Sequence, residues 1–211
     1  MVRHARPIIA SGICYGHLDV PAELEATQQA AKSFAETLTK SLTQALQDNA
    51  KNLSVKSIPI YVSGLQRAQQ LADALVLALT DVAGASGMHL QTDTRLNEMD
   101  FGIWEGKAWS EIPKEAFDQW SADFARHRFG GKESSQGVIN RVLAAYQATL
   151  EQAQISNSSD VIWITHAGVI RALSYFQKNG MRPIERAEQW PREAPGFGQF
   201  LCLDFAAITI K

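Results

Sequence analysis

The stretch that indicates the fold is VIWITHAGVIR, residues 161–171. Its first half is an apolar run with the length and composition of a buried strand, and a small-residue turn after His166 opens a helical pattern. α/β proteins place their chemistry in strand-to-helix turns of this kind. Further strands are expected at residues 1–4 and 58–62. The first is short for a central strand, so it is either clipped or preceded by further residues.

The C-terminal end of the chain is expected to add strands to the sheet. Two β-type runs, at residues 199–205 and 207–210, favour an antiparallel hairpin at one edge. Helices are predicted at residues 22–48, in a segment opening at 63–68 with Ser63 as N-cap, at 135–153 and at 169–178, with a loop at 81–91. We therefore predict an α/β fold: a three-layer α/β/α sandwich whose central sheet is mostly parallel, with an antiparallel edge strand.

Composition limits the classes of function. The 211 residues are 45% hydrophobic, which suits a single domain over residues 1–211. A formal charge of −2 gives no overall basic surface for nucleic acid. No apolar run approaches the ~20 residues of a membrane span, and the N-terminal apolar run is too short for a secretory signal, so a cytoplasmic location is expected. The two cysteines, Cys14 and Cys202, indicate neither a disulfide framework nor a metal site.

An aromatic segment at about residues 101–131 interrupts the alternation of strands and helices. It contains Trp104, Trp109 and Trp120 together with four phenylalanines. Ordinary packing of two short helices explains most of these side chains. An aromatic insertion between βα units is also a common way to build a substrate lid, and we predict a lid-like insertion here.

Three basic residues and two histidines are candidates for chemistry. Arg3 and Arg6 bracket His4, which indicates an anion-binding mouth with a potential nucleophile, although a solvated basic terminus has the same pattern. Arg67 falls in the first turn of a predicted helix, where a cation opposes the helix dipole. Either a bound anion offsets this cost, or Arg67 folds back onto a neighbouring carboxylate. His166 ends the strand at 161–165.

Other sites are not supported by the spacing of residues. Residues 102–107 are one residue too short for a phosphate-binding P-loop, and Ala108 stands where a hydroxyl is needed. Neither cysteine has the downstream arginine that a cysteine phosphatase requires. His17, His89 and His127 lack paired ligand spacing, so no metal is predicted, and no cofactor is expected.

Four blocks of sequence together carry a resemblance to a known family. They are VRH at 2–4, YVSGLQRA at 61–68, LNEMDFGIWEG at 96–106 and THAG at 165–168. In order and spacing they resemble the histidine phosphatase superfamily, which includes the phosphoglycerate mutases and the α-ribazole phosphatases. The resemblance implies a phosphoglycerate mutase-like fold. It also implies that His4 attacks phosphorus, that Arg3, Arg67 and His166 hold the phosphoryl oxygens, and that Glu98 protonates the leaving oxygen.

The chemistry of phosphoryl transfer is consistent with these roles. A phosphate monoester carries about two negative charges, so several cationic or donor groups are needed around its equatorial oxygens. His4 has to be neutral to attack, and adjacent arginines lower its pKa. Glu98 has to be protonated when the ester bond breaks and ionised when water attacks the phosphohistidine, so its carboxyl has to release and regain a proton.

The sequence also departs from the family. Ala5 stands where Gly is usual, which requires a negative φ. Arg6 stands where Glu is frequent; it either selects more anionic substrates or points to solvent. An asparagine that often follows is missing, and Ser11 is the nearest polar substitute. Tyr15 and His17 are expected to line the mouth of the site, and Trp104 and Ala167 complete the set of expected binding residues.

Residues 12–19, 101–106 and 130–134 are more similar to the α-ribazole phosphatases than to the mutases. The expected function is therefore hydrolysis of a small organic phosphate through a phosphohistidine, with α-ribazole 5′-phosphate as a candidate. A phosphoglycerate mutase and a non-catalytic phospho-ligand-binding module are the alternatives. The expected partner is a small-molecule phosphate monoester, with no nucleic acid or membrane, and the sequence leaves the oligomeric state, monomer or homodimer, open.

Overall fold

The computed structural model describes residues 1–48, 58–83, 89–158 and 160–204. Its sheet has the strand order β1-β4-β2-β3, formed by Val2–Arg3, Ile162–Thr165, Pro59–Val62 and His89–Thr92. Every neighbouring pair is parallel, with Val2 opposite Ile164 and Ile60 opposite Ile162. The predicted parallel sheet is confirmed, and its carboxyl ends all open toward the same edge.

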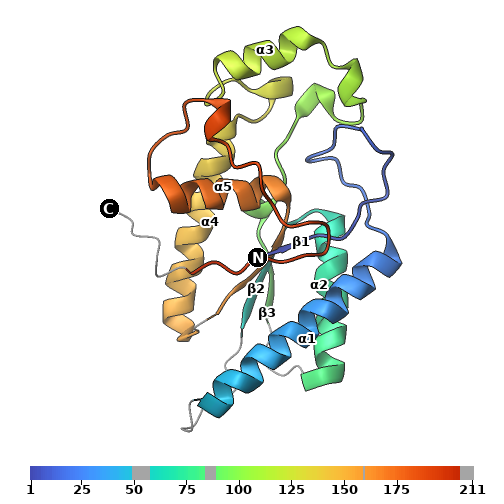
Figure 1. Ribbon diagram of the computed structural model, residues 1–211, viewed down its shortest axis with the longest axis vertical. Coiled ribbons are helices and arrows are strands. Elements are labelled where there is room, and N and C mark those ends of the chain that lie inside the picture. Colours follow the sequence, from blue (N-terminus) through green and yellow to red (C-terminus); the bar gives the residue numbers. More distant parts are fainter. Residues whose placement is uncertain (49–57, 84–88, 159, 205–211) are drawn as a thin grey trace.

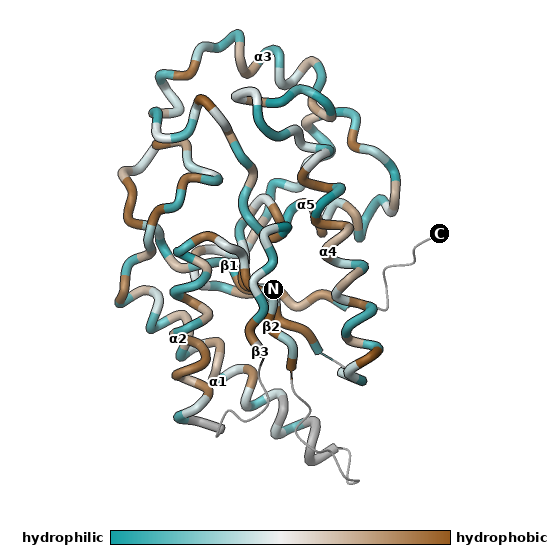
Figure 2. The backbone as a smooth tube through the Cα atoms, turned by 180° about the vertical axis from the view of Figure 1, so that it is seen from behind, coloured by the Kyte–Doolittle hydropathy of each residue, from teal (hydrophilic) through white to brown (hydrophobic). Residues whose placement is uncertain are grey.

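Two pairs of helices cover the sheet (Figure 1). Helices α1 (Leu24–Asp48) and α2 (Gln66–Ala83) pack on each other, as do α4 (Ser135–Ser156) and α5 (Ala167–Asn179). Along β2, Ile60 and Val62 belong to the core shared with α1 and α2, whereas Tyr61 belongs to the core shared with α4 and α5. This alternation is the two-residue period of a strand buried on both faces. The three-layer α/β/α prediction is confirmed, and Figure 2 shows β2 and β4 among the more hydrophobic segments.

The predicted antiparallel edge strand does not form within the described residues. Phe200 makes an isolated antiparallel bridge with Val2, and the amide of Leu201 donates to the carbonyl of Met1 at 2.8 Å. Residues 199–204 otherwise carry no strand, and the second predicted run, 207–210, lies outside the described residues. The segment has β-type composition, but the two-residue length of β1 gives it little to pair with.

The loop predicted at 81–91 is wrong at both ends. Helix α2 continues to Ala83, and β3 occupies His89–Thr92. Leu90 is the only apolar residue of β3 and is 43% exposed, so this strand lacks the apolar run that marks a buried strand. It forms because its backbone pairs with all four residues of β2 at the edge of the sheet.

The aromatic segment stands apart from the sheet at the top of Figure 1. It contains α3 (Lys114–Ala122) and the short 3-10 turns Gly102–Trp104, Trp109–Glu111 and Phe129–Gly131. The fully buried ring of Phe129 lies at its centre and packs on Trp104, Trp109, Phe117 and Trp120. Gly130 has φ 78°, and a Cβ there would collide with the carbonyl of Phe101, so a side chain is excluded at this close approach.

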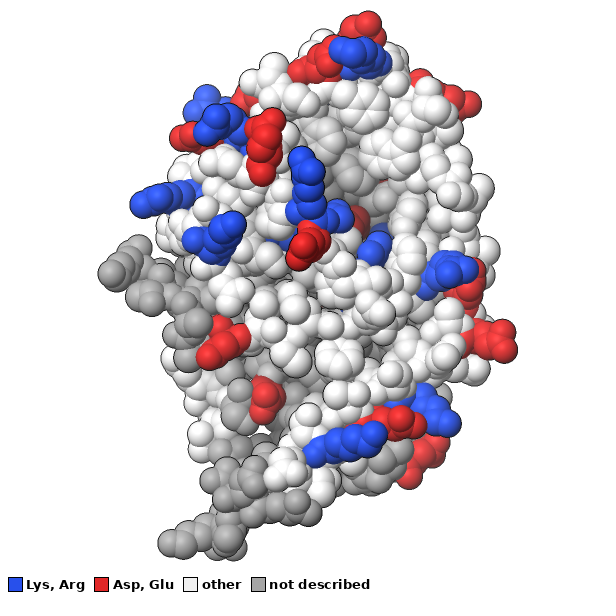
Figure 3. Space-filling view, viewed as in Figure 1, with Lys and Arg blue, Asp and Glu red and all other residues white. Residues whose placement is uncertain are grey.

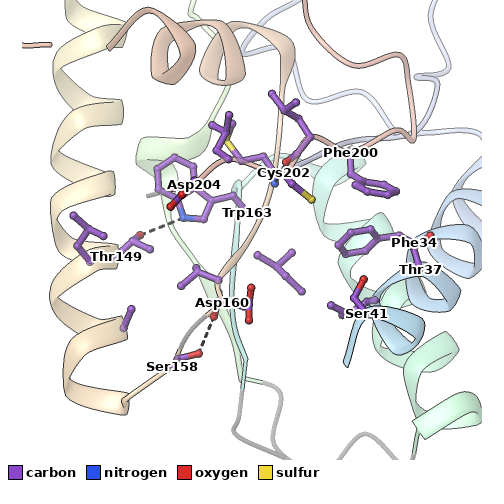
Figure 4. A pocket seen from close by; sticks show the side chains of 18 of the residues that line it. Phe34, Thr37, Ser41, Thr149, Ser158, Asp160, Trp163, Phe200, Cys202 and Asp204 are labelled. Atoms are coloured by element: carbon purple, nitrogen blue, oxygen red, sulfur yellow. Dashed lines mark hydrogen bonds between the residues drawn. The ribbon is translucent and has the colours of Figure 1, made fainter. Parts of the chain in front are cut away.

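A cavity of about 710 Å³ opens at the amino end of β4, between α1, α4 and residues 200–204 (Figure 4). Phe34, Phe200 and Trp163 line it, and the indole of Trp163 donates to Thr149 Oγ1 at 3.2 Å. His166 follows the other end of the same strand, so this cavity is separate from the predicted chemistry. Of the helices in the described residues, none has the length and hydrophobicity needed to span a bilayer.

Candidate active site

The carboxyl ends of strands β1, β2 and β4 bring the predicted residues together. His4, Ser63 and His166 follow β1, β2 and β4. The backbone amide of His4 donates to Thr165 at 3.0 Å, and the rings of His4 and His166 lie 4.9 Å apart between centroids. In Figure 3 the surface is hollowed beside the N-terminal end of α5, with basic and acidic atoms at the bottom of the hollow.

His4 has the protonation state of a nucleophile. Its Nδ1 lies 2.6 Å from the carbonyl oxygen of Ala5, which can only accept, so Nδ1 carries the hydrogen and Nε2 keeps its lone pair. The side chain is buried, and burial together with the charges of Arg67 and Arg3 lowers its pKa to about 3. The imidazole is therefore neutral at physiological pH. The φ of Ala5 is not positive. This is the condition under which alanine can replace the usual glycine at this position.

Arg67 lies in the first turn of α2 and is fully buried. Its Nη1 donates to the carbonyl of Leu18 at 2.9 Å and its Nη2 to that of Gly16 at 2.6 Å. These partners are carbonyls, whereas the sequence had suggested a folded-back ion pair as the alternative to a bound anion. Its Nε has no hydrogen-bond partner among the described residues. Burial lowers the pKa of Arg67, and the charge of Glu98 opposes that change.

Arg3 is held from the C-terminal side of the chain. Its Nη1 donates to the carbonyl of Pro195 at 2.9 Å, and its guanidinium lies 4.0 Å from the ring centroid of Phe197. Tyr15 shares a side-chain hydrogen bond with Arg3. The Nε of Arg3 and the Nδ1 of His166 are buried without a hydrogen-bond partner among the described residues, like the Nε of Arg67. Buried nitrogens are rarely unpaired, so three of them around His4 fit a tetrahedral oxyanion.

Glu98 lies in the loop after the 3-10 turn Thr94–Leu96, and its side chain points toward Arg3 and Arg67. Its Oε2 accepts the amide of Gly168 at 3.1 Å in the first turn of α5, and its Oε1 accepts the amide of Met99 at 3.1 Å. The charge of Glu98 acts on both Arg3 and Arg67. The carboxyl therefore lies beside the two guanidiniums and is held by backbone groups.

Gly168 makes this position of Glu98 possible. A Cβ on Gly168 would collide with Glu98 Oε1. We expect Gly168→Ala to displace the carboxyl and to lower kcat by roughly 10²-fold, the lower end of the range for a general acid. Steady-state kinetics would measure this loss, with Gly137→Ala in α4 as control, where the nearest atom to a new Cβ is Ser134 Oγ at 3.3 Å. Equal kinetics for the two variants would contradict the expectation.

The remaining predicted residues differ in burial and in what they contact. The guanidinium carbon of Arg67 lies 5.4 Å from the ring centroid of Tyr15. Ala167 is buried at the start of α5. His17 is exposed, and its Nε2 lies 3.2 Å from Asn97 Nδ2. Arg6 and Ser11 are exposed and line a hollow that also includes Tyr15 and Phe197.

The contacts found for Trp104 among the described residues are with the aromatic insertion and not with His4. The ring of Trp104 packs on Phe129, and Lys107 Nζ lies 5.0 Å from its centroid. It therefore belongs to the aromatic cluster of the insertion. A role in substrate binding stays a prediction.

Four residues near the site were not predicted as functional. Glu105 accepts the amides of Gly16, His17 and Leu18 at 3.1, 2.8 and 2.5 Å, and so fixes the turn that Arg67 holds by its carbonyls. Ser63 and Asn97 form a hydrogen-bonded chain to His166. Glu105, Ser63 and Asn97 lie inside the recognised blocks, so their positions were available in the sequence. Phe197 covers Arg3 and His4 from a loop with no motif.

No group of three His, Cys, Asp or Glu side chains suited to a metal is found in the part of the chain that the structure describes. The absence of a metal requirement stays a prediction from the sequence.

The two buried histidines give the fold a pH dependence. The folded pKa of His4 is about 3, and burial holds that of His166 well below 6.5. An unfolded chain binds protons at both near pH 6.5, so stability is lost as the pH falls below this value, by up to about 1.4 kcal/mol per pH unit for each histidine. Urea unfolding between neutral and acidic pH would measure the slope. His4→Gln should reduce it, and an unchanged slope would contradict the assignment.

The chain is similar in sequence to known phosphatases. A family model described as "Histidine phosphatase superfamily (branch 1)" matches residues 1–189. A protein of Hydrogenobacter thermophilus named "Putative phosphoserine phosphatase 2" is 32% identical over 117 residues, 54% of this chain and 52% of that protein. The chain thus spans about half the length of this curated relative.

Solved structures share the fold. Mycobacterial glucosyl-3-phosphoglycerate phosphatase aligns with a TM-score of 0.59 at 23% identity, over 84% of this chain and 77% of that one. A "putative alpha-ribazole-5'-P phosphatase" from Escherichia coli aligns with a TM-score of 0.59 at 22% identity, over 86% and 78%. These likenesses confirm the predicted phosphoglycerate mutase-like architecture. Since the family model covers most of its length, the chain belongs to branch 1 of the histidine phosphatase superfamily.

Proposed function

We propose that this chain is a phosphomonoesterase that hydrolyses a small organic phosphate through a phosphohistidine on His4. The observation that supports this best is the neutral His4, with a lone pair on Nε2, beside three buried nitrogens that have no partner among the described residues. A pure binding site has no use for a nucleophile placed next to a carboxyl group. A nucleophile, donors for the phosphoryl oxygens and an acid are together what phosphoryl transfer requires.

The proposed reaction has two half-reactions. In the first, His4 Nε2 forms a bond to phosphorus, the ester P–O bond breaks, and Glu98 gives its proton to the leaving oxygen. In the second, Glu98 takes a proton from water, the water oxygen bonds to phosphorus, and the P–N bond breaks, which restores His4 and releases inorganic phosphate. Arg3, Arg67 and His166 hold the three oxygens that stay on phosphorus throughout.

The proposed substrate carries its phosphate on an organic group that the aromatic side chains around His4 can contact. Phe197 is 40% exposed and lies 5.5 Å from the His4 ring, and Tyr15 packs below Arg67 on the other side. Partly exposed rings provide apolar contact beside a polar centre. α-Ribazole 5′-phosphate, which has an aromatic base, is the candidate that the sequence blocks favour.

The insertion at about residues 101–131 is proposed as the lid of a single domain. Its residue Glu105 fixes the turn at 16–18, which in turn borders Arg67. The sequence also supports a cytoplasmic protein with no cofactor. Arg6, Ser11, His17, Trp104 and Ala167 keep their proposed role in substrate binding.

The test is a turnover screen. The purified protein would be assayed against metabolite monoesters, including α-ribazole 5′-phosphate, phosphoserine and the phosphoglycerates, by release of inorganic phosphate. We expect hydrolysis that chelators leave unchanged and that vanadate inhibits, because vanadate mimics five-coordinate phosphorus. Phosphate transfer between the hydroxyls of phosphoglycerate without release would indicate a mutase. Phosphate binding without turnover of any ester would indicate a binding module.

Phe197 gives a narrower test of substrate choice. We expect Phe197→Ala to raise KM for esters with an aromatic base by up to about 10-fold, in line with the ~0.5–1.5 kcal/mol that aromatic contacts contribute. KM for phosphoserine should change much less, because its alcohol is small and polar. Steady-state kinetics on both esters would measure the ratio, and Phe117→Ala, in the aromatic cluster, would be the comparison variant. Equal changes for both esters would show that selectivity lies elsewhere.

A further inference from the structure

The hydrogen bonds behind His166 determine which of its nitrogens carries a proton. The first fixed point is the amide of Gly64, which can only donate and lies 2.7 Å from the side chain of Asn97. The atom that Asn97 presents to it is therefore the carbonyl oxygen Oδ1. Asn97 is buried, and its other side-chain atom, Nδ2, faces His17 Nε2 at 3.2 Å.

Ser63 transmits this assignment to His166. Its hydroxyl lies 2.9 Å from Asn97 Oδ1, which can only accept, so Ser63 gives its single hydrogen to Asn97. The Ser63 oxygen then acts only as an acceptor, and it accepts the amide of Leu65 at 3.2 Å. His166 Nε2 lies 2.7 Å from the same oxygen, so Nε2 has to be the donor. Ser63 and His166 are both fully buried, so water does not offer an alternative partner.

The other nitrogen of His166 is then left with a lone pair in the neutral ring. Nδ1 is buried and has no hydrogen-bond partner among the described residues. Burial keeps the pKa of His166 well below its usual value, and His4, Arg67, Arg141 and Arg3 lower it further. The neighbouring acid Glu98 lies across Gly168, and His17 lies beyond Asn97. A phosphoryl oxygen at Nδ1 would meet a lone pair in this state, and the contact would be repulsive.

We infer that Ser63 and Asn97 are positioning residues that hold the His166 proton on Nε2, so that the site binds a phosphoryl oxygen together with a proton at Nδ1. The proton forms the Nδ1–H bond and comes either from the P–O–H group of a monoanionic substrate or, for an oxyanion without a proton, from solvent. His166 then donates to the ligand as an imidazolium, with Nε2–H still bonded to Ser63. This inference rests on the proposed function, because it assumes that the oxyanion lies beside His4.

The test uses tungstate, a tetrahedral oxyanion that carries no proton near neutral pH. Calorimetric titration at about pH 8 in buffers of different ionisation enthalpy gives the number of protons taken up. We expect about one for the unmodified protein, with a dissociation constant that rises about tenfold per pH unit above neutrality. In Ser63→Ala the ring is free to hold its hydrogen on Nδ1, so proton uptake should fall toward zero and the pH dependence should flatten.

Three further variants separate the sources of the proton and the effects on folding. His4→Gln should keep the uptake near one, since the proton goes to His166. Ser63→Thr retains the hydroxyl and should restore the uptake that Ser63→Ala loses. Ser174→Ala removes a hydroxyl of α5 that bonds Ile170 O at 2.9 Å and should behave as the unmodified protein. Thermal melts of each variant would confirm that it is folded.

The outcomes separate this inference from the proposed function. Tungstate binding without proton uptake would overturn the inference and leave the proposed function intact. Unchanged uptake in a folded Ser63→Ala protein would overturn the role of Ser63. Failure of tungstate to bind the unmodified protein would overturn both.

Discussion

His4→Ala is expected to abolish turnover and to abolish the covalent phosphorylated form of the protein at the same time. His4 is the buried neutral imidazole with its lone pair on Nε2, and the rest of the site surrounds it. Without it, water would have to attack the ester directly, and the two-step route would be closed. The loss should exceed that of every other single substitution and leave no more than the residual rate that the arginines give by binding alone.

Rapid acid-free quench of the unmodified protein with labelled substrate, followed by mass spectrometry, would locate the phosphate. We expect it on His4 and expect it to be labile to acid. His127→Ala is the matched control, because it removes an imidazole that belongs to the insertion and has no proposed part in the chemistry. Full activity in the His4 variant, without a trapped phosphate, would refute the proposed mechanism.

Glu98→Gln is expected to have the second-largest effect, and the size should depend on the leaving group. The amide keeps the shape of the carboxyl but cannot give a proton to the departing oxygen. For alkyl phosphates, whose alcohols are poor leaving groups, we expect kcat to fall by roughly 10²–10⁴-fold. Activated aryl phosphates should lose much less, because their phenolate leaves without protonation.

The measurement is a plot of log kcat/KM against the pKa of the leaving alcohol for both proteins, which should be steeper in the variant. Glu105→Gln is a matched comparison, since it changes a nearby carboxyl that accepts the backbone amides of residues 16–18 and 101 and has no proposed part in proton transfer. Its losses should be similar for all esters. A uniform loss in Glu98→Gln would mean that this residue acts by position only.

Prediction from sequence succeeded where a local pattern determines the local structure. The strand at 162–165 and the helix that follows it are marked by an apolar run and a small-residue turn, and His166 lies between them as expected. The same holds for Arg67 in the first turn of α2. Parallel strands share one edge, so the grouping of His4 with His166 follows from topology.

Prediction failed where structure depends on partners distant in sequence. β3 has one apolar residue and exists because β2 offers it a backbone edge. Phe197 reaches Arg3 only because residues 195–198 fold back over β1, and nothing in that segment marks it as functional. The hydrogen bonds of Ser63 could not be assigned without knowing that Asn97 lies against both it and Gly64.

The position of β1 has a consequence for how the protein is made. Residues 1–4 are synthesised long before their partners, since Val2 pairs with Ile164 and the carbonyl of His4 accepts the amide of Gly198 at 3.0 Å. Contacts this distant in sequence form slowly, and during synthesis they cannot form until their partners have emerged. The segment that carries the proposed nucleophile therefore lacks these partners until residues 162–198 have been synthesised. Catalytic activity should be among the last properties acquired by the nascent protein.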